Sequence, residues 1–76
     1  MPTLLNQNGF KFIFYANEHP PHHVHVLKGD TWAKIEMRTA QVITSTLKPK
    51  DEKMAVALVK QHQHTFLEVW NDWFSR

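Results

Sequence analysis

The chain has 76 residues, a net charge of +2, six histidines, three tryptophans and no cysteine. A chain of this length has too little apolar surface for two cores, so residues 1–76 are expected to form a single domain. The lack of cysteine excludes disulfides, thiolate zinc sites and thiol nucleophiles, and it favours a cytoplasmic protein. The small net charge does not indicate a nucleic-acid-binding protein, and no run of about 18 apolar residues predicts a membrane span.

The first half of the chain has the patterns of β-strands. A short apolar start at residues 3–6 is followed by Asn8 and Gly9, a dipeptide typical of a two-residue hairpin turn. In residues 10–15 three phenylalanines alternate with other side chains, so they share one face of a strand, and we interpret it as the core face. Pro20 and Pro21 then interrupt the pattern.

Three further strands are predicted at residues 23–27, 31–37 and 41–46. In the first of them, histidines alternate with valines. In the second, Ala33, Ile35 and Met37 are expected to face the core. Trp32, Lys34 and Glu36 are expected to face away from it. The third is a weaker prediction that rests on its β-branched residues.

The last third of the chain predicts one long helix. Pro49 suits the first helical position, acidic residues follow it, and no glycine or proline interrupts the chain before Phe74. The expected apolar stripe of this helix consists of Met54, Leu58, His62, Phe66, Val69, Trp70 and Trp73. The predicted fold is therefore α+β, a small antiparallel β-meander of four strands packed against one C-terminal helix.

One helix covers only one face of such a sheet. The other face carries Ile13, Tyr15 and Trp32, so a symmetric homodimer through these residues is a further expectation.

The histidines are the main candidates for a functional site. His23 and His25 are expected on the same side of a strand, roughly 7 Å apart, because each residue advances the chain by about 3.3 Å. His19 precedes the two prolines. His62 lies on the predicted apolar stripe, where its imidazole needs a polar partner that a histidine of the sheet would supply.

Three interpretations of these histidines stay open. In the structural one, they are strand and turn residues that bond to backbone or water. In the second, His23 and His25 act as acid and base in cleavage of a phosphodiester, such as RNA, while Lys34 stabilises the developing charge. In the third, His19, His23, His25 and His62 hold a transition metal such as Zn²⁺, with Glu18 or Glu36 as a further ligand.

Residues 14–26, which include His-Val-His-Val at positions 23–26, resemble the signature of a family of small bacterial proteins, the domain of unknown function 4160. The resemblance covers essentially the whole chain and weakens at residues 38–48. It implies that the characteristic polar residues are His19, His23, His25, Lys34 and His62. His22 is at a variable position, and His64 is outside the pattern.

The resemblance also implies a cytoplasmic bacterial protein encoded beside another small protein, in an arrangement like a toxin–antitoxin pair, without an established activity. The leading hypothesis is therefore an interaction protein that binds this cognate partner through a sheet edge or an aromatic patch. The alternative is a histidine-dependent nuclease, metal-free or metal-assisted, or a metal-binding protein. Under that hypothesis RNA is a possible second partner, and Trp32 could stack on a base.

Overall fold

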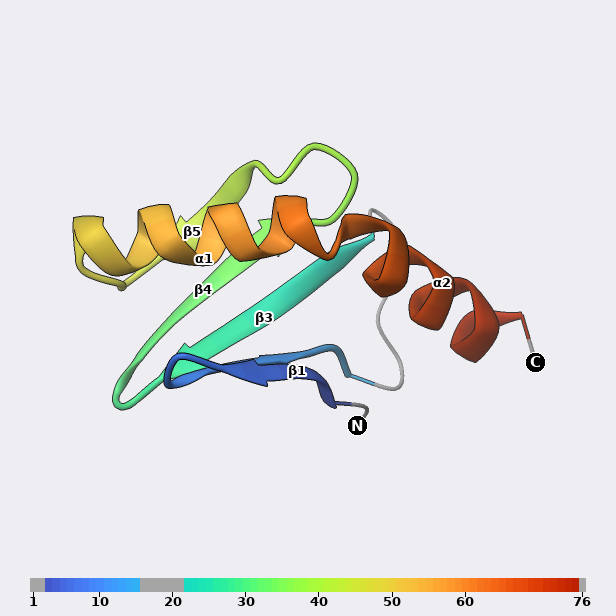
Figure 1. Cartoon of the computed structure of the whole chain (residues 1–76), viewed down its shortest axis with the longest axis horizontal. Helices are drawn as coiled ribbons and strands as arrows, with labels where there is room; N and C mark the ends of the chain where they lie inside the picture. The colour runs from blue at the N-terminus through green and yellow to red at the C-terminus, as the bar shows by residue number, and fades with distance from the viewer. Residues whose placement is uncertain (1–2, 16–21, 76) are drawn as a thin grey trace.

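The computed structural model describes residues 3–15 and 22–75, which form an antiparallel sheet and two helices (Figure 1). The strands pair in chain order, as a meander: β1 (Thr3–Gln7), β2 (Phe10–Ile13), β3 (His23–Lys28), β4 (Thr31–Glu36) and β5 (Val42–Ser45). The helices are α1 (Pro49–Gln61) and α2 (Gln63–Phe74). The α+β class is confirmed, but the described residues contain five strands and two helices instead of four strands and one helix.

The additional strand is β1, where the sequence predicts only a short apolar start. Asn8 and Gly9 have φ angles of 56° and 82°, and two consecutive positive φ values give a turn whose twist matches that of two paired strands. The predicted hairpin turn therefore does pair its two flanks, with Gln7 opposite Phe10 and Leu5 opposite Phe12.

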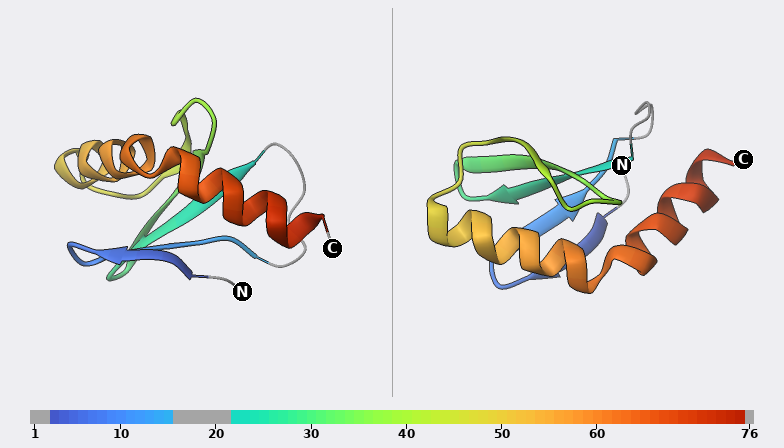
Figure 2. Two further views of the ribbon diagram at one scale, coloured as in Figure 1. Left: turned by 45° about the vertical axis from the view of Figure 1, so that its right-hand side comes forward. Right: turned by 90° about the horizontal axis from the view of Figure 1, so that it is seen from above.

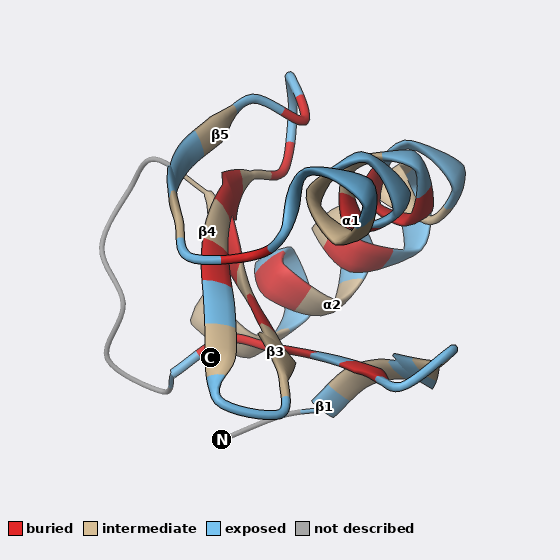
Figure 3. Cartoon of the chain, turned by 90° about the vertical axis from the view of Figure 1, so that its left-hand side faces the viewer, coloured by how far each residue is buried: buried red, intermediate tan, exposed pale blue. Residues whose placement is uncertain are grey.

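The two helices lie on one side of the sheet, and the core is between them and the sheet (Figure 3). The predicted core faces are confirmed, because the three phenylalanines of residues 10–15 and the side chains of Ala33, Ile35 and Met37 are buried. From α2, Phe66 packs on Phe12 with ring centroids 5.7 Å apart, and Trp70 packs on Phe14 at 5.2 Å.

The predicted single helix is broken at His62, which has φ −106° and ψ 14°. A continuous helix over residues 49–74 would be about 39 Å long at 1.5 Å per residue. That is longer than the longest extent of the molecule, which is 36 Å. At the break the chain changes direction (Figure 2), and α2 packs on β2 through Phe66 and Phe12 while α1 lies near β4.

The predicted apolar stripe is buried only in part. Leu58, Phe66 and Trp70 are buried as expected, but 43% of Met54 is exposed. In α1 the core face instead includes Ala55 and Val59. The expected placement of Met54 on the core side is therefore wrong, because the buried side of α1 runs through Ala55, Leu58 and Val59 and leaves Met54 at its margin.

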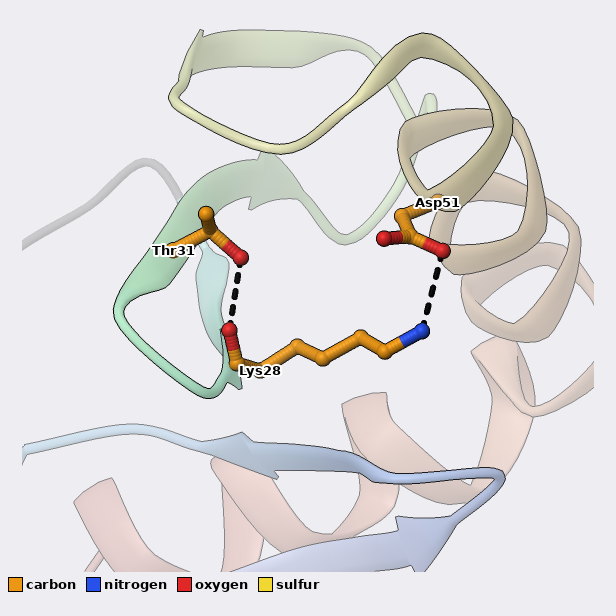
Figure 4. Close-up of polar contacts among 3 residues, drawn as sticks. All are labelled: Lys28, Thr31 and Asp51. Carbon is orange, nitrogen blue, oxygen red and sulfur yellow. Dashed lines mark hydrogen bonds and ion pairs between the residues drawn. The ribbon is translucent and has the colours of Figure 1, made fainter.

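A polar contact joins the tip of the β3–β4 hairpin to the first turn of α1 (Figure 4). The Lys28 Nζ donates to Asp51 Oδ1 at 3.0 Å and lies 4.9 Å from the centre of the Phe10 ring. The Thr31 hydroxyl donates to the Lys28 carbonyl at 2.6 Å. Within the described residues, neither helix has the length and apolar character needed to cross a membrane.

Candidate functional site

The sheet face turned away from the helices carries the predicted site, and we call it the open face. Strand alternation and the pairing of β3 with β2 and β4 place these side chains on it, because paired residues share a face. Its described members in β2 to β5 are Lys11, Ile13, His23, His25, Leu27, Trp32, Lys34, Glu36 and Thr44. This face is not exposed throughout: the side chains of Ile13 and His23 are buried, so Ile13 is already covered within one copy and does not fit the expected homodimer surface.

The two histidines of β3 lie next to each other, as their spacing predicts. The ring centroids of His23 and His25 are 5.3 Å apart, and the rings meet edge to face. His25 also contacts the ring of Tyr15 at 4.7 Å. His23 is buried and lies 5.8 Å from the Trp70 ring, whereas His25 is partly exposed. In this pair the imidazole of His23 is therefore buried beside Trp70, and the imidazole of His25 is accessible to solvent.

Lys34 is the residue of β4 that pairs directly with His25. Side chains that pair in this way have Cβ atoms about 4.5–5.5 Å apart, so the ammonium group can reach a ligand bound at the imidazole. The structure thus brings together His23, His25 and Lys34, the three residues that the acid–base hypothesis requires.

Glu36 pairs with His23 at the end of the open face, but its carboxylate is turned into the loop between β4 and β5. It accepts the N–H of Arg38 at 2.9 Å, the N–H of Thr39 at 3.2 Å and the Thr39 hydroxyl at 2.6 Å. Partial burial acts to raise the pKa of Glu36, but these hydrogen bonds and the charge of Arg38 hold its pKa below the ordinary 4.5. Its oxygens are therefore used by the loop.

His62 lies at the joint of the two helices, on the opposite side of the sheet from His23 and His25. Its ring stacks on Phe66 at 5.8 Å, and its Nε2 atom is buried without a hydrogen-bond partner. The histidine partner expected for it is not found among the described residues. His23, His25 and His62 do not form a group that could hold a metal ion by themselves.

The remaining metal candidates, His19 and Glu18, lie outside the described residues. The metal site that includes His19 therefore stays a prediction. Of the histidines set aside in the sequence, His64 is exposed and lies 3.2 Å from Glu68, one helical turn away.

Sequence reasoning missed two ring contacts of the site. Tyr15 lies on His25, and the signal for this was the alternation that puts Tyr15 on the same side as Ile13, the partner of His25. His22, at a position that the family resemblance implies is variable, packs on Trp70 at 4.9 Å. That contact depends on where α2 lies after the helix break, so no local pattern could have predicted it.

These features define a class of small α+β domain, in which helices cover one face of an antiparallel meander and a histidine pair lies on the other. Residues 9–71 match the model of a family described as Domain of unknown function (DUF4160), and the chain belongs to that family. No curated protein and no solved structure is significantly similar to the chain. The family description names no activity, so the function is argued from the structure.

Proposed function

We propose that the protein is the interaction component of a toxin–antitoxin-like pair, and that its partner adds a strand to the edge strand β5. The partner in this proposal is the small protein expected to be encoded beside it. The observation that carries the proposal is the composition of β5, a sheet edge that has neither a charged residue nor a proline.

The outer side of an edge strand presents N–H and C=O groups that can pair with another chain. Proteins commonly prevent this pairing with lysine or proline on the edge. The other edge strand, β1, also has no charged residue. We favour β5 because 48% of Ile43 is exposed, which gives a partner strand an apolar side chain to cover as well as backbone groups to pair with.

The substitution Ile43→Lys tests this proposal, because it puts a charge on the edge without changing the core. Met54→Lys on α1 is the matched control, since Met54 is 43% exposed. Calorimetric titration with the neighbouring small protein should show binding weakened at least about tenfold by Ile43→Lys and unchanged by Met54→Lys. Equal effects of both substitutions, or no effect of Ile43→Lys, would contradict the proposal.

A second candidate function is histidine-dependent cleavage of RNA, and the pairing of Lys34 with His25 beside His23 favours it. In this proposal one imidazole removes the proton of the 2′-hydroxyl, which attacks the phosphorus, while the other protonates the leaving 5′-oxygen. Lys34 stabilises the charge that develops on the phosphoryl oxygens. A metal-assisted or purely metal-binding form would use His23 and His25, with His19 as a further ligand, and a metal such as Zn²⁺; His62, on the other side of the sheet, is not part of it.

The double substitution His23→Asn and His25→Asn separates the two functions. Cleavage should be lost while binding of the protein partner is kept, with circular dichroism used to verify folding. Cleavage at the wild-type rate by this variant, or no cleavage by the wild type, would contradict the second candidate. Metal analysis of the untagged protein tests its metal-dependent form, which requires bound metal that falls when His25→Asn is introduced.

A further inference from the structure

We infer that the accessible part of the open face binds single-stranded RNA, with Trp32 and Tyr15 as stacking surfaces. This inference requires neither the partner strand at β5 nor cleavage at the histidines. Trp32 is 40% exposed and Tyr15 is 42% exposed, and both belong to the same side of the sheet. Exposed aromatic rings on a sheet are the means by which several RNA-binding domains stack bases.

Cations accompany the aromatic rings on this face. Lys34 follows Trp32 by two residues on β4, so their side chains point to the same side. Lys11 is the partner of Leu27, which in turn is the partner of Trp32. The described face therefore places an ammonium group on two sides of Trp32, where phosphates of a stacked strand would pass.

Acidic groups are placed elsewhere, which gives the face a charge that complements phosphate. Among the described residues of the open face, Glu36 is the single acidic one, and its carboxylate is bonded into its own loop. The other described acidic residues lie in the β3–β4 turn or on the helices, and they are Asp30, Asp51, Glu52, Glu68 and Asp72. Two lysines and one carboxylate bonded into its loop therefore give the described open face a small positive charge.

The Trp32 platform is held in place by its backbone. The Trp32 N–H donates to the Thr46 hydroxyl at 2.9 Å, and the Trp32 carbonyl accepts the Thr46 N–H at 2.8 Å. A ring carried by a fixed strand loses little conformational freedom when a base stacks on it. The backbone that carries the Trp32 ring is therefore ordered before binding.

A nucleic acid fits this face better than a protein does. The centres of protein interfaces are depleted of lysine, whereas here lysines separate the exposed aromatic rings. Alternating rings and cations instead match the alternating bases and phosphates of a single strand. Thr44, the exposed partner of Lys34 in β5, offers a hydroxyl group for a 2′-hydroxyl, which favours RNA over DNA.

Fluorescence anisotropy with a labelled, unstructured 12-nucleotide RNA tests the inference on the full chain at low salt. Trp32→Ala should weaken binding at least about fivefold, the lower end of the effect of losing one base-stacking ring. Lys34→Gln should weaken binding to all sequences alike and reduce the slope of log affinity against log salt by about 1. The matched controls on α1, Met54→Ala and Lys53→Gln, should bind within about twofold of the wild type.

Several results would overturn the inference. They are the absence of saturable RNA binding, equal losses in the variants and their controls, and equally tight binding of the matching DNA. The Ile43→Lys variant is expected to bind RNA like the wild type, so the RNA inference and the partner-strand proposal can fail independently. A loss of RNA binding in Ile43→Lys equal to that in Trp32→Ala would place the RNA elsewhere. Sedimentation showing a dimer that Trp32→Ala dissociates would make the face a protein interface instead.

Discussion

At the scale of single residues, Glu36 shows how one carboxylate sets a local structure. Three hydrogen bonds to Arg38 and Thr39 favour its ionised form and lower its pKa from 4.5. A carboxyl group whose pKa is lower in the folded state stabilises the fold above its unfolded pKa, and this contribution is lost as the pH falls through the folded pKa. The loop after β4 should therefore depend on pH in the acidic range.

We predict that Glu36→Gln lowers the free energy of unfolding at pH 7 by about 1 kcal/mol, the typical value of hydrogen bonds lost at a partly exposed site. The difference from the wild type should shrink as the pH falls below 4.5, where the wild-type carboxyl group becomes protonated too. Urea unfolding at a series of pH values measures this. Glu68→Gln, in an exposed pair with His64, is the control and should change stability little at any pH.

Residue patterns predicted much of the candidate site. Period-two alternation was enough to place His23 and His25 side by side and to put Lys34 on their face, because a strand allows only two directions for a side chain. It could not predict that the Glu36 carboxylate accepts hydrogen bonds from the loop residues Arg38 and Thr39. It also could not place His62, because that depended on an unbroken helix.

At the scale of elements, the joint between α1 and α2 is the feature that local sequence did not predict. Breaks of this kind are usually expected at glycine or proline, and residues 50–74 contain neither. The joint is held instead by a contact distant in sequence. The Gln63 side-chain amide donates to the Met37 carbonyl at 2.8 Å and also to the Arg38 carbonyl. Tertiary contacts with the β4–β5 loop thus stabilise the break between the two helices.

Substituting Gln63→Ala should therefore destabilise the protein by about 1 kcal/mol, because two carbonyl groups lose their donor. The neighbouring substitution Gln61→Ala is the control, since Gln61 is exposed and should tolerate the change. Amide hydrogen exchange provides the more specific measurement. Faster exchange in Gln63→Ala should be concentrated at residues around the joint, and a uniform increase along both helices would argue against this role of the joint.

At the scale of the whole molecule, Phe14 links the sheet to the C-terminal helix. It is fully buried, and its ring contacts Trp70 at 5.2 Å, Phe74 at 5.6 Å and Trp73 at 6.3 Å. A domain of this size has a total stability on the order of 5–10 kcal/mol. The contacts of Phe14 with the three aromatic rings of α2 therefore contribute a large part of the free energy that holds α2 on the sheet.

We expect Phe14→Ala to lower the free energy of unfolding by about 3–5 kcal/mol, which leaves a marginal fold. The milder Phe14→Leu keeps the protein measurable if the alanine variant does not fold. Tyr15→Ala is a close control, because Tyr15 is the next residue and is 42% exposed on the other face, so its loss should cost less than about 1 kcal/mol. Urea denaturation followed by tryptophan fluorescence distinguishes them, and similar midpoints for the two alanine variants would contradict the assignment.

The two uncharged edges also affect how copies of the protein meet one another. β1 and β5 are at opposite ends of one sheet, so each copy offers two places for strand addition. Pairing of β5 with β1 of the next copy is a head-to-tail contact, which forms an open filament unless the rotation closes a ring. A partner that occupies β5 would then act as a terminator of polymerisation, and the free protein would become the more aggregation-prone of the two states as its concentration rises.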